Sequence, residues 1–249
     1  MAVHIIIPAR YASTRFPGKP LALINGKPMI QHVYEAATTS AANHVSVATD
    51  DERIAACVKS FGGQAVMTSP TLPSGTDRCG QAAQMLGLTP EDIVINVQGD
   101  EPFITGKIIN LLIQLFRDPA VQIATLTSLI TRAEEVNDPN KVKVVFDKNH
   151  KALYFSRHNI PYLRNPEQFT PQYFKHIGIY GYTYGVLQEL IQLPESDLEK
   201  SEKLEQLRWL ENGYSIHVAE CAYEGIGVDT PEDLKQVTGY KGQGIEVKN

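Results

Sequence analysis

Three cations in one short stretch are the first sign of chemistry in this sequence. Residues 7–20 carry Arg10, Arg15 and Lys19, and this stretch begins where the apolar run Val3–Ile7 ends. An arginine can bind phosphate oxygens through two parallel hydrogen bonds, and a lysine acts as a mobile point charge. The stretch is therefore a candidate polyphosphate site. Its spacing differs from that of the G-x-x-x-x-G-K-[ST] phosphate loop, and an exposed basic turn without a ligand is the alternative.

Two aspartates are candidate metal ligands. Asp100 follows the apolar run 92–97, and Asp229 lies in a glycine-rich turn before a predicted helix. Magnesium is typically held by one or two carboxylates together with water and substrate phosphate oxygens. In the alternative interpretation, Asp100 is an ordinary turn residue and Asp229 only caps the helix.

Several polar residues in the second half could contact a sugar acid. Arg157 follows a short predicted strand, and His176 lies within another, so together they could supply a cation and a neutral hydrogen-bonding group. These candidates also have alternative interpretations. His176 could be a structural histidine, Tyr180 could serve strand packing, and Glu205 and Gln206 could lie on a solvated helix face.

The first half shows the alternation that would position these residues. Apolar runs at 3–7, 44–48, 64–68 and 92–97 predict strands, with helices predicted from residues 28, 51 and 76. This pattern, which continues to residue 117, is typical of an α/β fold with a doubly wound, mostly parallel sheet. The strand ends should meet at one edge of the sheet, where a nucleotide would lie. We also expect a short strand over 21–24 and a helix cap at Thr49.

The second half is less regular. Strands are predicted over 122–129, 141–146, 152–155, 173–182 and 216–219, and helices over 184–193 and 199–211. Either Asp229 or Thr230 is expected to cap a last helix that begins at Pro231. We predict a nucleotide-binding half at 1–120, a second region at 121–237 within the same sheet, and a flexible tail at 238–249.

Composition narrows the class of protein. The 249 residues are 43% hydrophobic and 20% charged, with a net charge of −5, which disfavours a general nucleic-acid binder. The three widely spaced cysteines suggest neither a disulfide framework nor a thiolate zinc site. No stretch is typical of a signal peptide or a membrane span, so we expect a soluble cytoplasmic protein without membrane contacts.

Six motifs together resemble one family. They are P-A-R-Y-A-S-T-R-F-P-G-K-P, I-N-V-Q-G-D-E-P, A-L-Y-F-S-R, K-H-I-G-I-Y-G-Y, K-L-E-Q-L-R and G-V-D-T-P-E-D-L, and the resemblance extends from residue 4 to about residue 237. Each motif is weak alone, but this set in this order is similar to CMP-KDO synthetase, the 3-deoxy-manno-octulosonate cytidylyltransferase of Gram-negative bacteria. The loop 165–172 is shorter than in some relatives, and the tail beyond Lys241 matches no family motif.

The resemblance implies roles for individual residues. Arg10, Arg15 and Lys19 would hold the triphosphate of CTP, and Asp100 and Asp229 would bind Mg²⁺. The residues implied near the cytidine and the sugar are Ser74, Gly75 and Gln98, and those implied for the sugar-acid pocket are Arg157, His176, Tyr180, Glu205 and Gln206. The family is homodimeric, with a Rossmann-like nucleotide-binding half and a second region that carries dimer contacts. The resemblance therefore implies a homodimer here, with 121–237 as the sugar-binding and dimerisation region.

The expected reaction joins CTP and 3-deoxy-D-manno-octulosonate (KDO) to give CMP-KDO and diphosphate, for lipopolysaccharide biosynthesis. In-line attack of the anomeric hydroxyl on the α-phosphorus needs positioning and charge neutralisation more than covalent help from the protein. The sugar could instead be 8-amino-3,8-dideoxy-manno-octulosonate or another acidic sugar. A CTP-binding sensor and a dimeric scaffold are the non-enzymatic alternatives.

Overall fold

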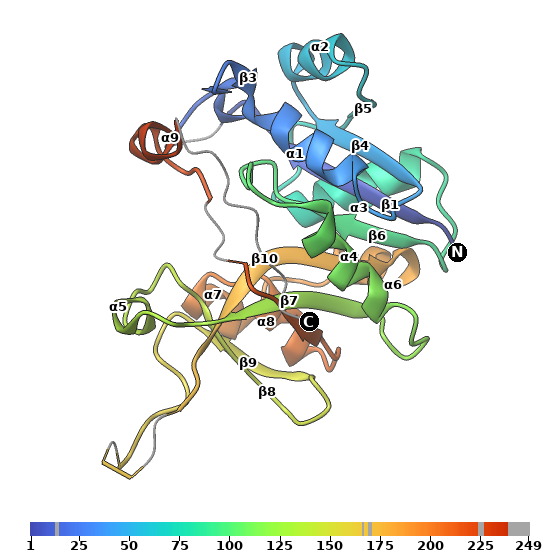
Figure 1. The fold of residues 1–249 in the computed structure, drawn as a ribbon. Helices are drawn as coiled ribbons and strands as arrows, with labels where there is room; N and C mark the ends of the chain where they lie inside the picture. The colour runs from blue at the N-terminus through green and yellow to red at the C-terminus, as the bar shows by residue number, and fades with distance from the viewer. Residues whose placement is uncertain (13–14, 166, 169–170, 224–226, 239–249) are drawn as a thin grey trace.

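The computed structural model describes residues 1–12, 15–165, 167–168, 171–223 and 227–238. Within these ranges, the strands form one large mixed sheet and a small hairpin of β2 (Leu23–Ile24) and β3 (Lys27–Pro28). The main path of the large sheet runs β11-β7-β10-β6-β1-β4-β5, and β8 and β9 extend it beside β10. Figure 1 shows helices on both faces of this sheet.

The N-terminal half supplies four parallel strands. They are β1 (Val3–Ala9), β4 (His44–Thr49), β5 (Ala65–Met67) and β6 (Ile93–Asn96). β1 is central, since its residue Ile5 pairs with Val45 of β4 on one side and with Ile95 of β6 on the other. Because helices cover both faces, these strands are apolar along most of their length, and their carboxyl ends lie at the same edge.

Two apolar cores lie on opposite faces of the sheet. In β1, Ile5 and Ile7 belong to one core and Ile6 to the other, as the period of two in a strand requires. The first core includes α1 (Met29–Thr38), α2 (Glu52–Ser60) and α4 (Gly106–Leu115). The second includes α3 (Gly75–Met85), α6 (Tyr184–Leu190) and α8 (Gln206–Glu211). The predicted doubly wound, mostly parallel α/β sheet is confirmed.

The second half continues the same sheet. Its strands are β7 (Ile123–Leu129), β8 (Lys143–Phe146), β9 (Ala152–Ser156), β10 (Phe174–Thr183) and β11 (His217–Glu220), and a short helix, α5 (Ala133–Val136), follows β7. β10 runs antiparallel to both β6 and β7, so it joins the two halves. A bulge between Ile177 and Tyr180 shifts its register against β7.

Two of the predicted elements are wrong. The stretch 199–211 is not one helix but two, α7 (Asp197–Glu202) and α8, because Lys203 adopts a left-handed conformation with φ of 53°. Residues 21–24 are not a single strand, since a 3-10 helix, η1 (Lys19–Leu21), precedes β2. Apolar spacing alone does not reveal such breaks, because Leu204 and Leu207 are buried in both arrangements.

The predicted cap at Thr49 is also wrong. Asp51 is the N-cap of α2 and accepts a hydrogen bond from the Arg53 N–H, 2.9 Å away. Thr49 instead ends β4 and is fully buried. At the other end of the chain, the prediction for Thr230 is confirmed: it caps α9 (Pro231–Val237), which packs beside the β2–β3 hairpin (Figure 1).

Some of the predicted irregular segments lie partly outside the described residues. They include the tail at 239–249, residues within the loop 165–172, and the glycine turn at 224–226. In the described ranges, none of the helices combines the length and the apolarity that a membrane span needs.

Candidate active site

An open cavity of about 250 Å³ lies at the carboxyl ends of the parallel strands. The end of β1 contributes Pro8, Ala9 and Arg10, and the segment after β6 contributes Gln98 and Asp100. This is the edge at which open α/β sheets bind ligands. The cavity brings together eight of the residues predicted from the sequence, namely Arg10, Arg15, Lys19, Ser74, Gly75, Gln98, Asp100 and Asp229.

The basic loop folds back on itself at Gly18. Gly18 has φ of 73°, its N–H donates to the Tyr11 carbonyl oxygen at 2.9 Å, and a β-carbon there would lie 3.1 Å from the Tyr11 ring. Only glycine adopts this backbone conformation without strain, so the turn requires a glycine at position 18. The turn begins η1, whose first residue is Lys19, and so directs that lysine toward the aspartates.

The two aspartates lie on either side of one ammonium group. Lys19 Nζ lies 2.6 Å from Asp100 Oδ2 and 3.1 Å from Asp229 Oδ1. Arg15 adds a second cation, with Nη2 3.3 Å from Asp229 Oδ2. Asp229 is held in place because the Val228 N–H donates to the Asp100 carbonyl oxygen at 3.0 Å. The structure therefore brings together the two aspartates that the resemblance assigns to one metal ion.

The other wall of the cavity is the start of α3. Ser74 caps this helix by accepting a hydrogen bond from the Asp77 N–H at 3.1 Å, and Gly75 is so close to Pro8 that a β-carbon would lie 3.3 Å away. Gln98 is held by Asn96, to whose Oδ1 its Nε2 donates at 3.3 Å. The small residues and the cap leave room and backbone donors for a flat ligand such as a nucleoside.

Arg78 is a cavity residue that the sequence analysis missed. Its guanidinium is nearly buried, donating to Thr68 Oγ1 at 2.6 Å and to Asp50 Oδ2 at 3.1 Å. The sequence contained one signal for a cavity position of Arg78. Arg78 is four residues after Ser74, so the two residues lie on the same face of a helix.

Glu101 was also missed. It accepts a hydrogen bond from the Tyr223 hydroxyl at 2.8 Å, and burial raises the pKa of its carboxyl to about 7. Its position directly after Asp100 was the one signal in the sequence. The contact ties the segment after β6 to residues 221–223, which follow β11 (His217–Glu220), and thereby supports the aspartate pair.

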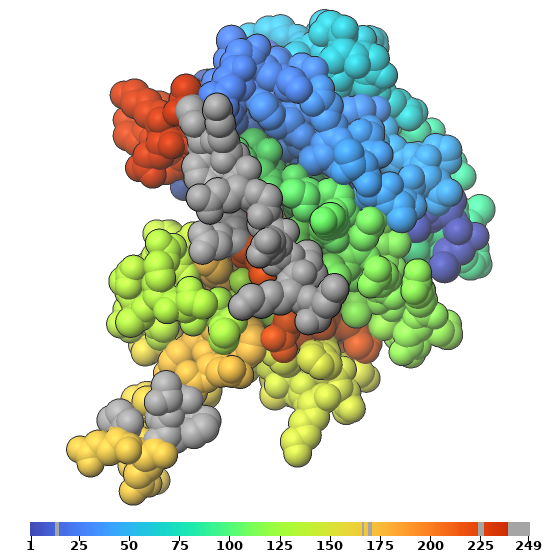
Figure 2. Space-filling view, in the orientation of Figure 1, coloured from blue at the N-terminus to red at the C-terminus, as the bar shows by residue number. Residues whose placement is uncertain are grey.

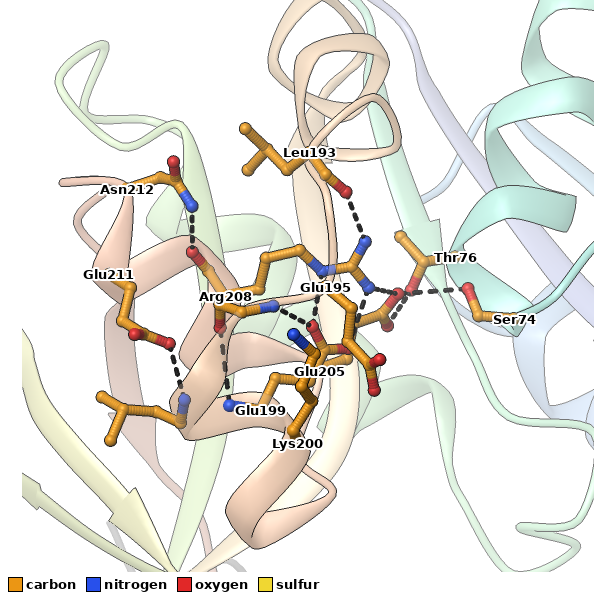
Figure 3. Close-up of polar contacts among 12 residues, drawn as sticks. Ser74, Thr76, Leu193, Glu195, Glu199, Lys200, Glu205, Arg208, Glu211 and Asn212 are labelled. Carbon is orange, nitrogen blue, oxygen red and sulfur yellow. Dashed lines mark hydrogen bonds and ion pairs between the residues drawn. The ribbon is translucent and has the colours of Figure 1, made fainter.

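Glu205 links the second half to the cavity wall. Its carboxylate accepts hydrogen bonds from Ser74 Oγ at 3.1 Å and from Thr76 Oγ1 at 2.6 Å, and Arg208 Nη2 lies 3.3 Å from it (Figure 3). Burial raises the pKa of Glu205, while the two hydroxyls and Arg208 oppose that shift. Glu205 therefore does not lie on a solvated helix face. Of its two interpretations, the geometry favours a position at the site.

Three more predicted residues form a buried polar group behind this wall. His176 lies in β10 and is half-buried. Its Nε2 is 3.0 Å from Thr125 Oγ1, and desolvation lowers the pKa of the ring to about 3, which keeps the ring neutral. Tyr180 packs against it, with ring centroids 5.2 Å apart. Among the described residues, the Tyr180 hydroxyl and Gln206 Nε2 have no hydrogen-bonding partner. Buried polar atoms of this kind usually have a partner, although neither Tyr180 nor Gln206 is among the residues that line the cavity.

Arg157 is not among the residues that line the cavity. Its Nε donates to the Glu202 carbonyl oxygen at 2.7 Å, and its Nη1 to the Pro139 carbonyl oxygen at 3.0 Å. Nη2 reaches the Lys203 carbonyl oxygen at 3.4 Å. In this structure Arg157 therefore donates to the backbone carbonyl groups at the end of α7 and does not point its donors toward a binding site for a carboxylate.

The comparisons with known proteins agree on one kind of enzyme. The family model described as cytidylyltransferase matches residues 4–216. An 8-amino-3,8-dideoxy-manno-octulosonate cytidylyltransferase of Shewanella sp. (strain W3-18-1) is 53% identical over 237 residues, which cover 94% of this chain and 96% of the relative. A 3-deoxy-manno-octulosonate cytidylyltransferase of Parabacteroides distasonis is 51% identical over 243 residues, covering 94% and 96%.

A solved structure gives the same result. CMP:2-keto-3-deoxy-manno-octonic acid synthetase, in a complex with CTP, superimposes with a TM-score of 0.91 at 49% sequence identity, covering 96% of this chain and 98% of that one. The sheet, the cavity and the paired aspartates are thus found in a chain whose similarity extends over nearly its full length.

Proposed function

The chain belongs to the cytidylyltransferase family, and we propose that it transfers CMP from CTP to an acidic eight-carbon sugar, KDO, giving CMP-KDO and diphosphate for lipopolysaccharide biosynthesis. The observation that carries this proposal is the cavity in which Arg10, Arg15 and Lys19 face Asp100 and Asp229. A scaffold protein would have no use for such a concentration of charge at the edge of the sheet.

The basic residues would act on the triphosphate. When the anomeric hydroxyl attacks the α-phosphorus in line, negative charge accumulates on the departing diphosphate. Arg10, Arg15 and Lys19 would offset this charge from fixed positions, and fixed donors cost little reorganisation during the reaction. The wall formed by Ser74, Gly75 and Gln98 would orient the cytidine and the sugar for attack.

Magnesium is the cofactor that this site fits. Two carboxylates already converge on one cationic atom, the Lys19 ammonium, and magnesium typically needs only one or two carboxylates beside phosphate oxygens and water. We therefore infer that Asp100 and Asp229 would hold the ion. Magnesium bound there would neutralise phosphate charge and lower the pKa of the attacking hydroxyl. The described residues contain no cluster of three or more histidine, cysteine or acidic side chains, so a site that relies on protein ligands alone is not favoured.

The sugar would lie toward Glu205 and the buried polar group. The Tyr180 hydroxyl and Gln206 Nε2 can donate hydrogen bonds to a polyol, and neutral His176 lies beside them. Binding the sugar would satisfy buried atoms that otherwise lack partners, which favours a hydroxyl-rich ligand. The proposal does not depend on Arg157, whose donors are occupied by carbonyl groups.

The identity of the sugar is the open part of the proposal. Relatives named for KDO and for its 8-amino analogue are nearly equally similar to this chain, at 51% and 53% identity. The test is diphosphate release with magnesium and CTP, with each sugar in turn and with UTP, ATP and GTP in place of CTP. We expect release only when CTP and KDO are both present. Release with the 8-amino sugar alone would reassign the acceptor, and CTP binding without any release would favour a sensor.

We also propose a cytoplasmic homodimer. The residues around β9 and the following arm expose apolar side chains, with Leu153 and Tyr162 exposed by 61% and 84%. Figure 2 shows this arm, in yellow and gold, projecting from the body of the molecule. An exposed apolar arm is favoured when a second subunit covers it. Light scattering coupled to size exclusion should give twice the mass of 27.6 kDa, and cell fractionation tests the location.

A further inference from the structure

Arg208 is the centre of a polar network behind the cavity wall. Nη1 donates to the Leu193 carbonyl oxygen at 2.9 Å. Nη2 donates to Glu199 Oε1 at 3.0 Å. Nε lies 2.9 Å from Glu199 Oε2 as an ion pair but is not aligned for a hydrogen bond. The planar fork of the guanidinium therefore reaches the Leu193 carbonyl and Glu199 at once, an arrangement that a lysine ammonium does not reproduce. Its side chain is only 13% exposed, so solvent screens these contacts weakly.

The network reaches the cavity through Glu205. Arg208 Nη2 lies 3.3 Å from Glu205 Oε1, and the same carboxylate accepts from Ser74 and Thr76 on the opposite half of the protein. Figure 3 shows this path from the Arg208 guanidinium to the start of α3. Ser74 lines the cavity, whereas Arg208 does not. Any influence of Arg208 on the site must therefore pass through another residue.

We propose that Arg208 is a positioning residue for cytidylyl transfer: it holds Glu205 ionised and in place, and Glu205 in turn aligns Ser74 and Thr76 at the cavity wall. The inference rests on the proposed function, because the wall matters only if the cavity holds CTP and the sugar. In this role the two properties of Arg208 act separately. Its positive charge keeps Glu205 ionised, and its planar fork of donors keeps Glu205 in place, whereas a purely stabilising residue would not need to do either.

The charge requirement follows from the surroundings of Glu205. The groups that face Glu205 are Arg208 on α8, Asp77 and Cys79 on α3, and Tyr180 and Tyr182 on β10. Burial and the neighbouring Asp77 raise the pKa of Glu205, and Arg208 lowers it. A protonated Glu205 would lose half of its capacity to accept the two hydroxyl hydrogens, so the alignment weakens when this cation is removed.

Two variants separate the charge from the fork. In Arg208→Gln the charge is lost, and we expect the acid limb of the pH–rate profile to move to higher pH. The KM for the sugar should also rise by about tenfold to 100-fold, because misplacing a wall by an ångström has effects of that order. In Arg208→Lys the charge remains, so the acid limb should stay near that of the wild type while kcat/KM falls. CTP binding, measured calorimetrically, should change less than the KM for the sugar in both variants, since Arg10 and Lys19, which would hold the triphosphate, are untouched.

Arg117→Gln is the matched control, because Arg117 is an exposed arginine at the end of α4, outside the cavity. A readout independent of turnover is the titration of Glu205, followed by carbon NMR in glutamate-labelled protein and assigned with Glu205→Gln. The pKa of Glu205 should rise in Arg208→Gln and stay near the wild-type value in Arg208→Lys.

An equal loss of turnover at every pH, with an unchanged Glu205 titration, would show that Arg208 only stabilises the fold and would overturn the inference. Absence of diphosphate release by the wild type would contradict the proposed function instead, and the titration would still decide whether Arg208 holds Glu205 ionised.

Discussion

Lys19 Nζ lies 2.6 Å from Asp100 Oδ2, in the position between Asp100 and Asp229 where a divalent ion would reduce the repulsion of two carboxylates. The Lys19 side chain is 12% exposed, so the contact is partly shielded from water. An ammonium group that neutralises both aspartates also competes with any other cation for them. Under the proposed function, the triphosphate of CTP would offer Lys19 an alternative partner, and the aspartates would then become available to magnesium.

The first prediction concerns this competition. In Lys19→Met, magnesium should bind more tightly when CTP is absent, because the competing ammonium has been removed. A partly exposed ion pair contributes about 1 kcal/mol, which corresponds to about fivefold in Kd. Titration calorimetry with magnesium chloride measures the change. Lys27→Met is the control, since Lys27 pairs with Glu35 instead. Weaker magnesium binding in Lys19→Met would show that the lysine does not compete for the site.

The second prediction concerns Asp100. Asp100→Asn should lower kcat by roughly 100-fold or more while CTP binding is largely kept, because an amide oxygen is a poorer ligand than a carboxylate for a hard cation. The measurement is diphosphate release across a magnesium titration. Asp197→Asn is the matched control, as Asp197 is 97% exposed and pairs with Lys200 across one turn. Near-normal turnover of Asp100→Asn at saturating magnesium would contradict the metal role of this residue.

The basic loop and the aspartates show how far the sequence could be used. Arg10, Lys19 and Asp100 each follow a strand whose apolar run is short and unambiguous, so their convergence at one edge follows from a parallel sheet. The pairing of Asp100 with Asp229 could not be derived in this way. It depends on the contact of Val228 with the Asp100 backbone and on the packing of α9 against the β2–β3 hairpin, which are long-range features.

The second half of the chain was harder to predict for physical reasons. The helix break at Lys203 leaves the apolar spacing unchanged, so the pattern reads as one helix. The network of Arg208 with Glu199 and Glu205 forms only because of that break, which brings α7 and α8 together. Arg157 follows its strand as predicted, but tertiary contacts direct it to backbone carbonyl groups rather than into the cavity.

The third prediction concerns packing near the end of α1. A β-carbon at Gly106 would lie 2.7 Å from the Thr39 carbonyl carbon and 2.8 Å from the Ser40 nitrogen, and these backbone atoms cannot rotate away. Gly106→Ala should therefore lower the free energy of unfolding by about 1–3 kcal/mol, although alanine is the better helix former. Urea denaturation measures this. Gly178→Ala is the control, because nothing lies within 4 Å of its added carbon. Equal stability of the two variants would mean that α1 and α4 can separate at little cost.

The last prediction concerns His176 and acid stability. Burial lowers the pKa of His176 to about 3 from its ordinary value of 6.5. Since the unfolded chain takes up the proton first, the stabilising contribution of the neutral ring is complete above pH 6.5 and is lost progressively as the pH falls toward 3. Between pH 7 and pH 5, the free energy of unfolding should fall by about 2 kcal/mol on account of this group.

Comparing variants isolates that contribution from the effects of other titrating groups. In His176→Gln the protein loses the neutral ring, so its stability at pH 7 should be lower, but the further loss between pH 7 and pH 5 should be about 2 kcal/mol smaller than in the wild type. His158→Gln removes an exposed histidine and should leave the difference between the two pH values unchanged. Urea denaturation of the three proteins at both pH values provides the measurement. If His176→Gln kept the full wild-type loss, the ring would already be protonated in the folded state, and a neutral hydrogen-bonding role beside Tyr180 would have to be abandoned.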